Sequence, residues 1–257
     1  MEDRTGWIRI GRLLSWVVAG SFLLATVMFL LVEFGITTPE ASPAPPDLVD
    51  ATLASFRDEQ AGWPQELTSS LLFALGFAAL AALGVLLARA LAADLVRGSI
   101  TSFTFVAAGT LGVAAQLLYV GVKQVAIDPH YCDCRYAPEQ IISQARGLAL
   151  AEGAQRWLLG GFLVLAGLGF YQLAQSSLRR RLFNPRWAGL SHLMAAVFVL
   201  GLVGLAPQWD LAFRLVVLVG GGILLPIWSI WLHRELPTLA TPEAVQATPT
   251  PPEPRPT

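Results

Sequence analysis

The sequence has few charged residues, no block of one charge sign and only two cysteines. Charged side chains make up 14% of the 257 residues, against about 25% in an average soluble domain. The net charge is −1 and there is no basic run, which excludes nucleic acid as a partner. Two cysteines are too few to hold a small secreted scaffold together through several disulfides. What remains is a predominantly apolar chain.

Familiar catalytic motifs are also absent. The sequence contains no phosphate-binding glycine loop, no nucleophile elbow, no His-Glu-x-x-His and no Cys-x-x-Cys. It has no evident internal repeat, which is a common signature of secondary transporters. The sequence therefore gives no positive sign of an enzyme, and no cofactor is predicted apart from the metal considered below.

Long apolar runs dominate the chain. Hydrophobic residues make up 54% of it, and the mean hydropathy is +0.58. A helix that crosses a bilayer needs about 20 mostly apolar residues. The sequence predicts an all-α, polytopic membrane helix bundle in residues 1–236, with outer loops at 37–67 and 124–155. Its six transmembrane helices are expected near residues 13–36, 68–92, 101–123, 156–177, 187–206 and 211–232.

Arginines indicate the orientation, because Lys and Arg are retained on the cytoplasmic side of a membrane. The short run Leu178–Arg186 carries four arginines, whereas Pro207–Asp210 carries an acid and no base. Both termini are therefore predicted to be cytoplasmic, in a plasma membrane, with the lipid bilayer as the main partner. The Pro- and Thr-rich segment 237–257 has no apolar face and is predicted to be a disordered cytoplasmic tail.

The tryptophans fall near the ends of the predicted spans. Such positions are typical of the aromatic belts at the membrane–water interface. We expect one belt on each side of the membrane. The inner belt would hold Trp7, Trp16, Trp187, Trp228 and Trp231, and the outer belt Trp63, Trp157 and Trp209.

The first outer loop contains a predicted short helix. Asp47 can cap a helix that runs through Gln60. The apolar side chains of Val49, Leu53 and Phe56 would share one face of that helix. We expect this face to rest on the membrane surface.

The second outer loop holds the residues with the most varied chemistry. Three interpretations of its His-x-Cys-x-Cys pattern stay open. Cys132 and Cys134 can form an inert local disulfide, or a strained bond that exchanges with other thiols. Alternatively, soft ligands of this kind suit zinc or copper. The candidate metal ligands are His130, Cys132, Cys134, Asp128 and Asp133.

Six polar residues share the outer half of the predicted bundle. Intramembrane polar residues usually face the bundle interior or a pathway. The set comprises Glu33, Gln116, Tyr119, Lys123, Asp210 and Arg214. One interpretation is structural, with a local Asp210–Arg214 pair and Lys123 extending to the interface. The other is an outward-open polar vestibule in which Glu33 faces Arg214 or Lys123.

Two polar residues lie in the predicted inner half. Tyr171 and His192 are about equally far from the turn that joins the fourth and fifth spans. Antiparallel helices would bring them to the same depth, where a hydrogen bond between them can hold the helices together. A structural role is expected for this pair.

The sixth span contains the strongest local irregularity. Gly220-Gly221-Gly222 is followed by Pro226, and such residues are usual causes of helix kinks. This span is predicted to be kinked, and to be the part that moves if any part does.

The C-terminal part carries a resemblance. Asn184-Pro185-Arg186-Trp187-Ala188-Gly189 leads into an apolar span, and Leu224-Leu225-Pro226-Ile227-Trp228 precedes Trp231 and a short polar tail. In these features the chain resembles the end of uncharacterised bacterial six-helix membrane protein families. The resemblance implies a bacterial plasma membrane protein, and those families have no activity to transfer. The loop with Cys132 and Cys134 does not match that pattern.

Three hypotheses for function follow. The first is a non-enzymatic structural or accessory subunit, or a sensor, that contacts another membrane protein or a second copy of itself. The second is a thiol-redox or metal-handling protein that uses the outer cysteines. The third is a small-molecule transporter that uses the outer polar residues.

Overall fold

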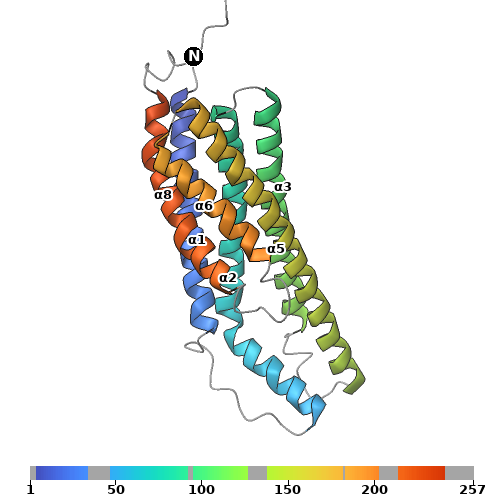
Figure 1. The fold of residues 1–257 in the computed structure, drawn as a ribbon. Helices are drawn as coiled ribbons and strands as arrows, with labels where there is room; N and C mark the ends of the chain where they lie inside the picture. The colour runs from blue at the N-terminus through green and yellow to red at the C-terminus, as the bar shows by residue number, and fades with distance from the viewer. Residues whose placement is uncertain are drawn as a thin grey trace, which may run out of the picture.

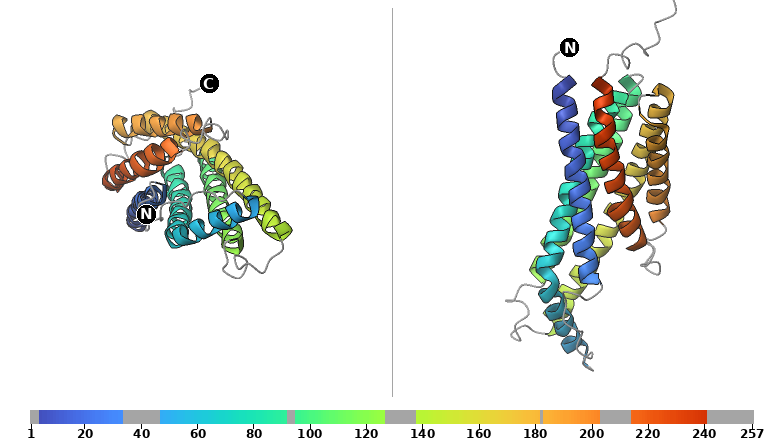
Figure 2. Two further views of the ribbon diagram at one scale, coloured as in Figure 1. Left: turned by 90° about the horizontal axis from the view of Figure 1, so that it is seen from below. Right: turned by 90° about the vertical axis from the view of Figure 1, so that its left-hand side faces the viewer.

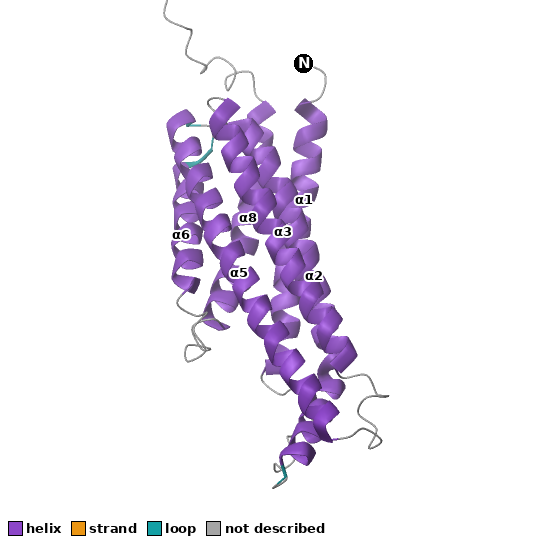
Figure 3. Ribbon diagram, turned by 90° about the vertical axis from the view of Figure 1, so that its right-hand side faces the viewer, coloured by secondary structure: helices purple, strands orange, loops and turns teal. Residues whose placement is uncertain are grey.

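The computed structural model describes residues 4–33, 47–91, 95–126, 138–181, 183–202 and 214–240. The described elements are all helices (Figures 1 and 3), which confirms the all-α prediction for this part of the chain. The long α-helices are α1 (Arg4–Glu33), α2 (Leu48–Leu91), α3 (Leu95–Ala126) and α5 (Pro138–Arg180). They are followed by α6 (Pro185–Gly201), the π-helix η3 (Val217–Leu224), α8 (Leu225–Glu235) and the 3-10 helix η4 (Leu236–Ala240).

The helices have the length and composition of membrane spans. Five stretches qualify within the described residues: Gly6–Val32, Glu59–Ala90, Gly98–Ala126, Glu139–Arg180 and Arg214–Thr238. The membrane character predicted from the sequence is thereby supported. The predicted span 187–206 corresponds to α6, whose 17 described residues fall short of the about 20 that a bilayer crossing needs.

Helix α2 is much longer than the span predicted within it. The segment expected to form a separate helix over 47–60 is continuous with the second span, and Pro64 lies inside the helix. Leu53 and Phe56 are buried in a small apolar cluster, so this face packs on protein and not on the membrane surface. Their partners in the cluster come from α3 and α5, namely Ala126, Ile141 and Leu148.

Successive long helices pack side by side, and the last helix returns to the first. Contacts join α1 to α2, α2 to α3, α3 to α5 and α5 to α6, while α8 packs against α1. Figure 2 shows this arrangement end-on. Arg12 Nη2 lies 3.1 Å from His233 Nε2, so the start of α1 and the end of α8 share one end of the bundle. The other ends of α2, α3 and α5 extend past α1 (Figure 1).

Aromatic side chains are the largest members of a core that also contains many leucines and alanines. Trp187 and Trp228 are fully buried and stack with ring centroids 5.4 Å apart. They were predicted to belong to the inner belt, but they pack inside the bundle. The exposed Trp7, Trp16 and Trp157 keep positions that suit a belt. Burial of Trp228 is possible because its indole nitrogen donates a 2.8 Å hydrogen bond to the Ser191 hydroxyl.

The glycine triplet forms the π-helix η3. Pro226, in the first turn of α8, has no N–H to offer the carbonyl of Gly222 four residues earlier. The N–H of Leu225 instead bonds the carbonyl of Gly220, five residues earlier. A Cβ on Gly222 would lie 2.6 Å from Thr26 Cγ2, so the missing side chain allows η3 to approach α1 closely. This irregularity lies where the sequence predicted a kink.

Candidate functional site

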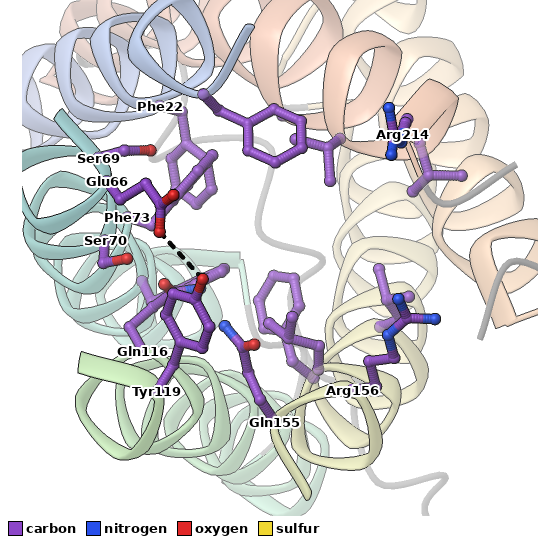
Figure 4. Close-up of a pocket in the computed structure, with 18 of the residues that line it drawn as sticks. Phe22, Glu66, Ser69, Ser70, Phe73, Gln116, Tyr119, Gln155, Arg156 and Arg214 are labelled. Carbon is purple, nitrogen blue, oxygen red and sulfur yellow. Dashed lines mark hydrogen bonds between the residues drawn. The ribbon is translucent and has the colours of Figure 1, made fainter. Parts of the chain in front are cut away.

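A cavity of about 330 Å³ lies in the half of the bundle that is distant from the two described chain ends. Residues from α1, α2, α3, α5 and α6 line it, together with Arg214, Val216 and η3 (Figure 4). This volume is at the lower end of the roughly 300–1,000 Å³ found for small-molecule sites. The polar lining residues are Glu66, Ser69, Ser70, Gln116, Tyr119, Glu152, Gln155, Arg156 and Arg214.

The deep part of the cavity is aromatic. Phe77 on α2 meets Phe162 on α5 edge to face, with ring centroids 4.5 Å apart. Phe22 on α1 contacts Phe77 in the same way at 5.2 Å, and Phe162 contacts Phe198 on α6 at 5.6 Å. All four rings line the cavity and belong to the main core. They form a floor to which an apolar group of a ligand can bind.

One wall carries an acidic side chain with a fixed hydrogen-bonding arrangement. The Tyr119 hydroxyl donates a 3.1 Å hydrogen bond to Glu66 Oε2, drawn as the dashed line in Figure 4. Lys123 Nζ donates to the same carboxylate oxygen and, at 2.9 Å, to the Tyr119 hydroxyl. Glu59 Oε2 lies 3.5 Å from Lys123 Nζ. Because Lys123 is only 4% exposed, its charge lies behind this wall and not on the cavity surface.

The opposite wall is basic. Arg156 on α5 and Arg214 on the last helix lie across the cavity from Glu66 and Tyr119 (Figure 4). Glu152 lies one turn before Arg156, and the Gln155 amide projects into the space between the walls. The cavity therefore has ionisable side chains on two facing walls and an apolar floor.

The structure brings together part of the polar set predicted from the sequence. Gln116, Tyr119 and Arg214 line the cavity. Lys123 contacts Glu66 and Tyr119, which line the cavity, and it also forms an ion pair with Glu59. Glu33 is the last residue of α1; its side chain lies outside the described residues, as does Asp210.

Several cavity residues were not predicted. Glu66 falls in the segment interpreted as an outer loop, as does Glu59, which does not line the cavity but contacts Lys123 behind its wall. Arg156 is the first residue of a predicted span. Had the helix been extended through Pro64, the seven-residue spacing of Glu59 and Glu66 would have placed both on one helix face. Pairing with Lys123 could then have been considered. For Ser69, Ser70 and Gln155 no sequence signal singles them out.

The inner polar pair is in contact. The rings of Tyr171 and His192 meet edge to face with centroids 5.7 Å apart. The nearest hydrogen-bonding partner of His192 is the Gln175 amide, 3.3 Å from Nε2, rather than the Tyr171 hydroxyl. The pair thus joins α5 to α6 through ring packing and an amide, which fits a structural role.

The cysteine loop lies outside the described residues. The candidate disulfide of Cys132 and Cys134 and the candidate ligands Asp128, His130 and Asp133 all fall in 127–137. Within the part of the chain that the structure describes, no three His, Cys, Asp or Glu side chains converge to hold a metal.

Comparison with known proteins does not assign this chain to a family. The chain matches no protein-family model. Likewise, no curated protein and no solved structure matches it. The functional argument therefore rests on the cavity itself.

Proposed function

We propose that the chain is a six-span transporter in a bacterial plasma membrane that binds a small amphipathic molecule from the outer side. The observation that carries the proposal is the cavity, with its aromatic floor and its charged rim of Glu66, Arg156 and Arg214. Charged residues at membrane depth are costly, and they are usually retained where they line a substrate pathway. The accessory or sensor role inferred from the sequence has no comparable feature in its favour.

The orientation follows from the arginines. The described chain ends share one end of the bundle, as the Arg12–His233 contact requires, and an even number of spans explains this arrangement. The same end holds Arg179, Arg180 and Arg181. The positive-inside rule makes this end cytoplasmic. The cavity then opens toward the outside, with α6 as the fifth span, and the resemblance to bacterial six-helix families agrees with this arrangement.

The last helix contains a segment, η3, whose conformation can change during transport. Gly221 of η3 lines the cavity, and Arg214 is the first residue of the helical turn 214–216 that leads into η3. π-Helical segments are less regular than α-helix and occur frequently at functional sites. A change of η3 toward regular α-helix would shift Arg214 relative to α5, and this is the motion we propose for transport.

Accessibility from both sides of the membrane tests this function. A Ser70→Cys variant is exposed to a membrane-impermeant maleimide in intact cells and in inside-out vesicles, and the peptide that contains residue 70 is analysed by mass spectrometry. A transporter that alternates exposes the cavity to each side in turn, so modification is expected in both preparations. Ser229→Cys, at a buried position near the described chain ends, is the control and stays unmodified in intact cells.

Two results would contradict the proposal. Modification of residue 70 in intact cells alone would indicate a binding protein that never opens inward. No modification in either preparation would mean that the cavity is closed to molecules of the reagent's size.

A further inference from the structure

A groove of about 270 Å³ lies between α3 and α5, at the end of the bundle that holds the described chain ends. The backbone N–H of Asn184, which follows α5, donates to Glu235 Oε2 at the end of α8, and this contact places the groove at that end. We propose that the groove binds an anionic phospholipid, with the lipid phosphate at Arg179. The proposal needs only that the helices cross a membrane, and it goes beyond the transport proposed above.

The groove opens on the outside of the bundle. Helices α3 and α5 lie side by side (Figure 1), and Ile100 and Tyr171, which border the groove, are each about half exposed. Arg179 is in the last turn of α5, and Gln172 lies two turns earlier, about 10 Å further into the membrane. The groove therefore extends from the level of lipid headgroups to the start of the hydrocarbon, and lipid reaches it from the side.

The lining of the groove is polar, although the surface around it is apolar. Its uncharged polar residues are Thr101, Gln172, Gln175 and Ser176. Lipid-facing positions are normally apolar, because an amide or hydroxyl without a partner in hydrocarbon costs free energy. Gln175 has a partner in His192, whereas the buried Oε1 of Gln172 accepts no hydrogen bond from the described residues. The groove thus offers polar groups beyond those that join the helices, as a headgroup site requires.

Arg179 makes the groove selective for an anion. It is exposed and forms no ion pair with another described residue, and no described carboxylate lines the groove. A guanidinium donates two parallel hydrogen bonds to a phosphate, and basic pockets between membrane helices bind anionic headgroups. Arg180 and Arg181 follow directly, so a choline headgroup would bring its own cation close to like charge. Phosphatidylglycerol, with an anionic phosphate and a hydroxyl-bearing headgroup, is the simplest lipid that fits.

Apolar side chains beyond the groove provide a surface for the acyl chains. On α3, the exposed Phe103 and Val106 follow Ile100 along one side of the helix. On α5, the exposed Leu168 lies one turn before Tyr171. Both rows lead from the groove toward the middle of the membrane. The groove's volume of about 270 Å³ is below the roughly 300–1,000 Å³ of sites that enclose a whole ligand. It therefore takes the headgroup, while the chains lie along these rows.

Native mass spectrometry of the purified full-length protein in detergent tests the proposal. Dioleoyl phosphatidylglycerol and dioleoyl phosphatidylcholine are titrated separately, and the dissociation constant of each is obtained from the fraction of protein that carries one added lipid. We expect phosphatidylglycerol to bind about fivefold more tightly, which corresponds to the attraction of one arginine for an anionic lipid. Inorganic phosphate, which has no acyl chains, should not bind at the same concentrations.

Two variants locate the site, and a third controls for charge. Arg179→Gln removes the cation from an exposed position, so the fold should be retained, and most of the preference for phosphatidylglycerol should be lost. Ser176→Trp places a bulky ring in the groove and should also remove the preference. Arg234→Gln removes the same charge from an exposed residue in the last turn of α8, which does not line the groove. This control should leave the preference unchanged.

Each of four results would overturn the proposal. Equal binding of the two lipids to the unaltered protein would show that it has no anionic site. A preference that persists in both Arg179→Gln and Ser176→Trp would place the site elsewhere. A preference that Arg234→Gln lowers as much as Arg179→Gln does would indicate a general attraction to the basic end of the bundle. Binding of inorganic phosphate as tight as that of phosphatidylglycerol, and blocked by Ser176→Trp, would make the ligand a soluble anion and not a lipid.

Discussion

The ammonium of Lys123 donates a 2.9 Å hydrogen bond to the Tyr119 hydroxyl one turn earlier on α3, and both side chains donate to Glu66 on α2. This contact joins two helices beside the cavity. A buried lysine is stable only when its charge has partners, and here two carboxylates supply them. The same contact fixes the position of the Glu66 carboxylate on the cavity wall.

Removal of this lysine should destabilise the bundle. Lys123→Met removes the cation that pairs with Glu66 and Glu59. We expect the free energy of unfolding to fall by about 2–4 kcal/mol, which is less than the cost of breaking a fully buried pair because both carboxylates are partly exposed. Unfolding in mixed micelles with increasing dodecyl sulfate measures this loss. Lys123→Met/Glu66→Gln should recover part of the loss, whereas purely additive effects would show that the pair is not coupled.

The hydrogen bond between Trp228 and Ser191 makes a second stability prediction. Ser191→Ala leaves the buried indole N–H of Trp228 without its acceptor, at an expected cost of about 1–3 kcal/mol. Ser229→Ala is the matched control on the next residue after Trp228, because the buried Ser229 hydroxyl has no partner among the described residues. In the same unfolding measurement, Ser229→Ala should be as stable as the parent protein or more stable. Equal loss in both variants would contradict the assigned role of Ser191.

Close packing of α2 on α3 gives a third stability prediction. A Cβ on Gly84 would lie 2.1 Å from Phe105 Cγ, a fully buried ring. Gly84→Ala should therefore lower stability by about 1–3 kcal/mol through overpacking. A Cβ on Gly121 meets nothing within 4 Å, so Gly121→Ala should be neutral or slightly stabilising, because alanine favours helix. Thermal unfolding midpoints in detergent compare the two. A Gly84→Ala protein as stable as Gly121→Ala would rule out this packing.

The sequence was informative where apolar runs decide the structure. Because a bilayer-spanning helix must satisfy its backbone within itself, long apolar runs predict helices directly, and the described parts of those runs are helical. The irregular last helix was also predictable, since Gly220-Gly221-Gly222 and Pro226 are local causes that a single sequence reveals.

Contacts between helices were less predictable. The spacing of Tyr119 and Lys123 placed them on one face of α3, but nothing in one sequence states which helix that face meets. Glu66 was missed because the helix was ended at Gln60, whereas α2 continues through Pro64. Trp187 and Trp228 were assigned to a belt by their position near span ends, yet burial depends on which way each helix is rotated. These features are set by tertiary packing, which a pattern of residue types along one chain does not encode.

Accessibility of residue 70 tests the central claim most directly. The rate at which Ser70→Cys reacts with the impermeant maleimide is measured in intact cells and in inside-out vesicles, and again after Ser69→Trp narrows the cavity. If the cavity opens to each side in turn, residue 70 should react in both preparations, and the added tryptophan should slow both reactions. Reaction in only one preparation, or no reaction in either, would contradict the account.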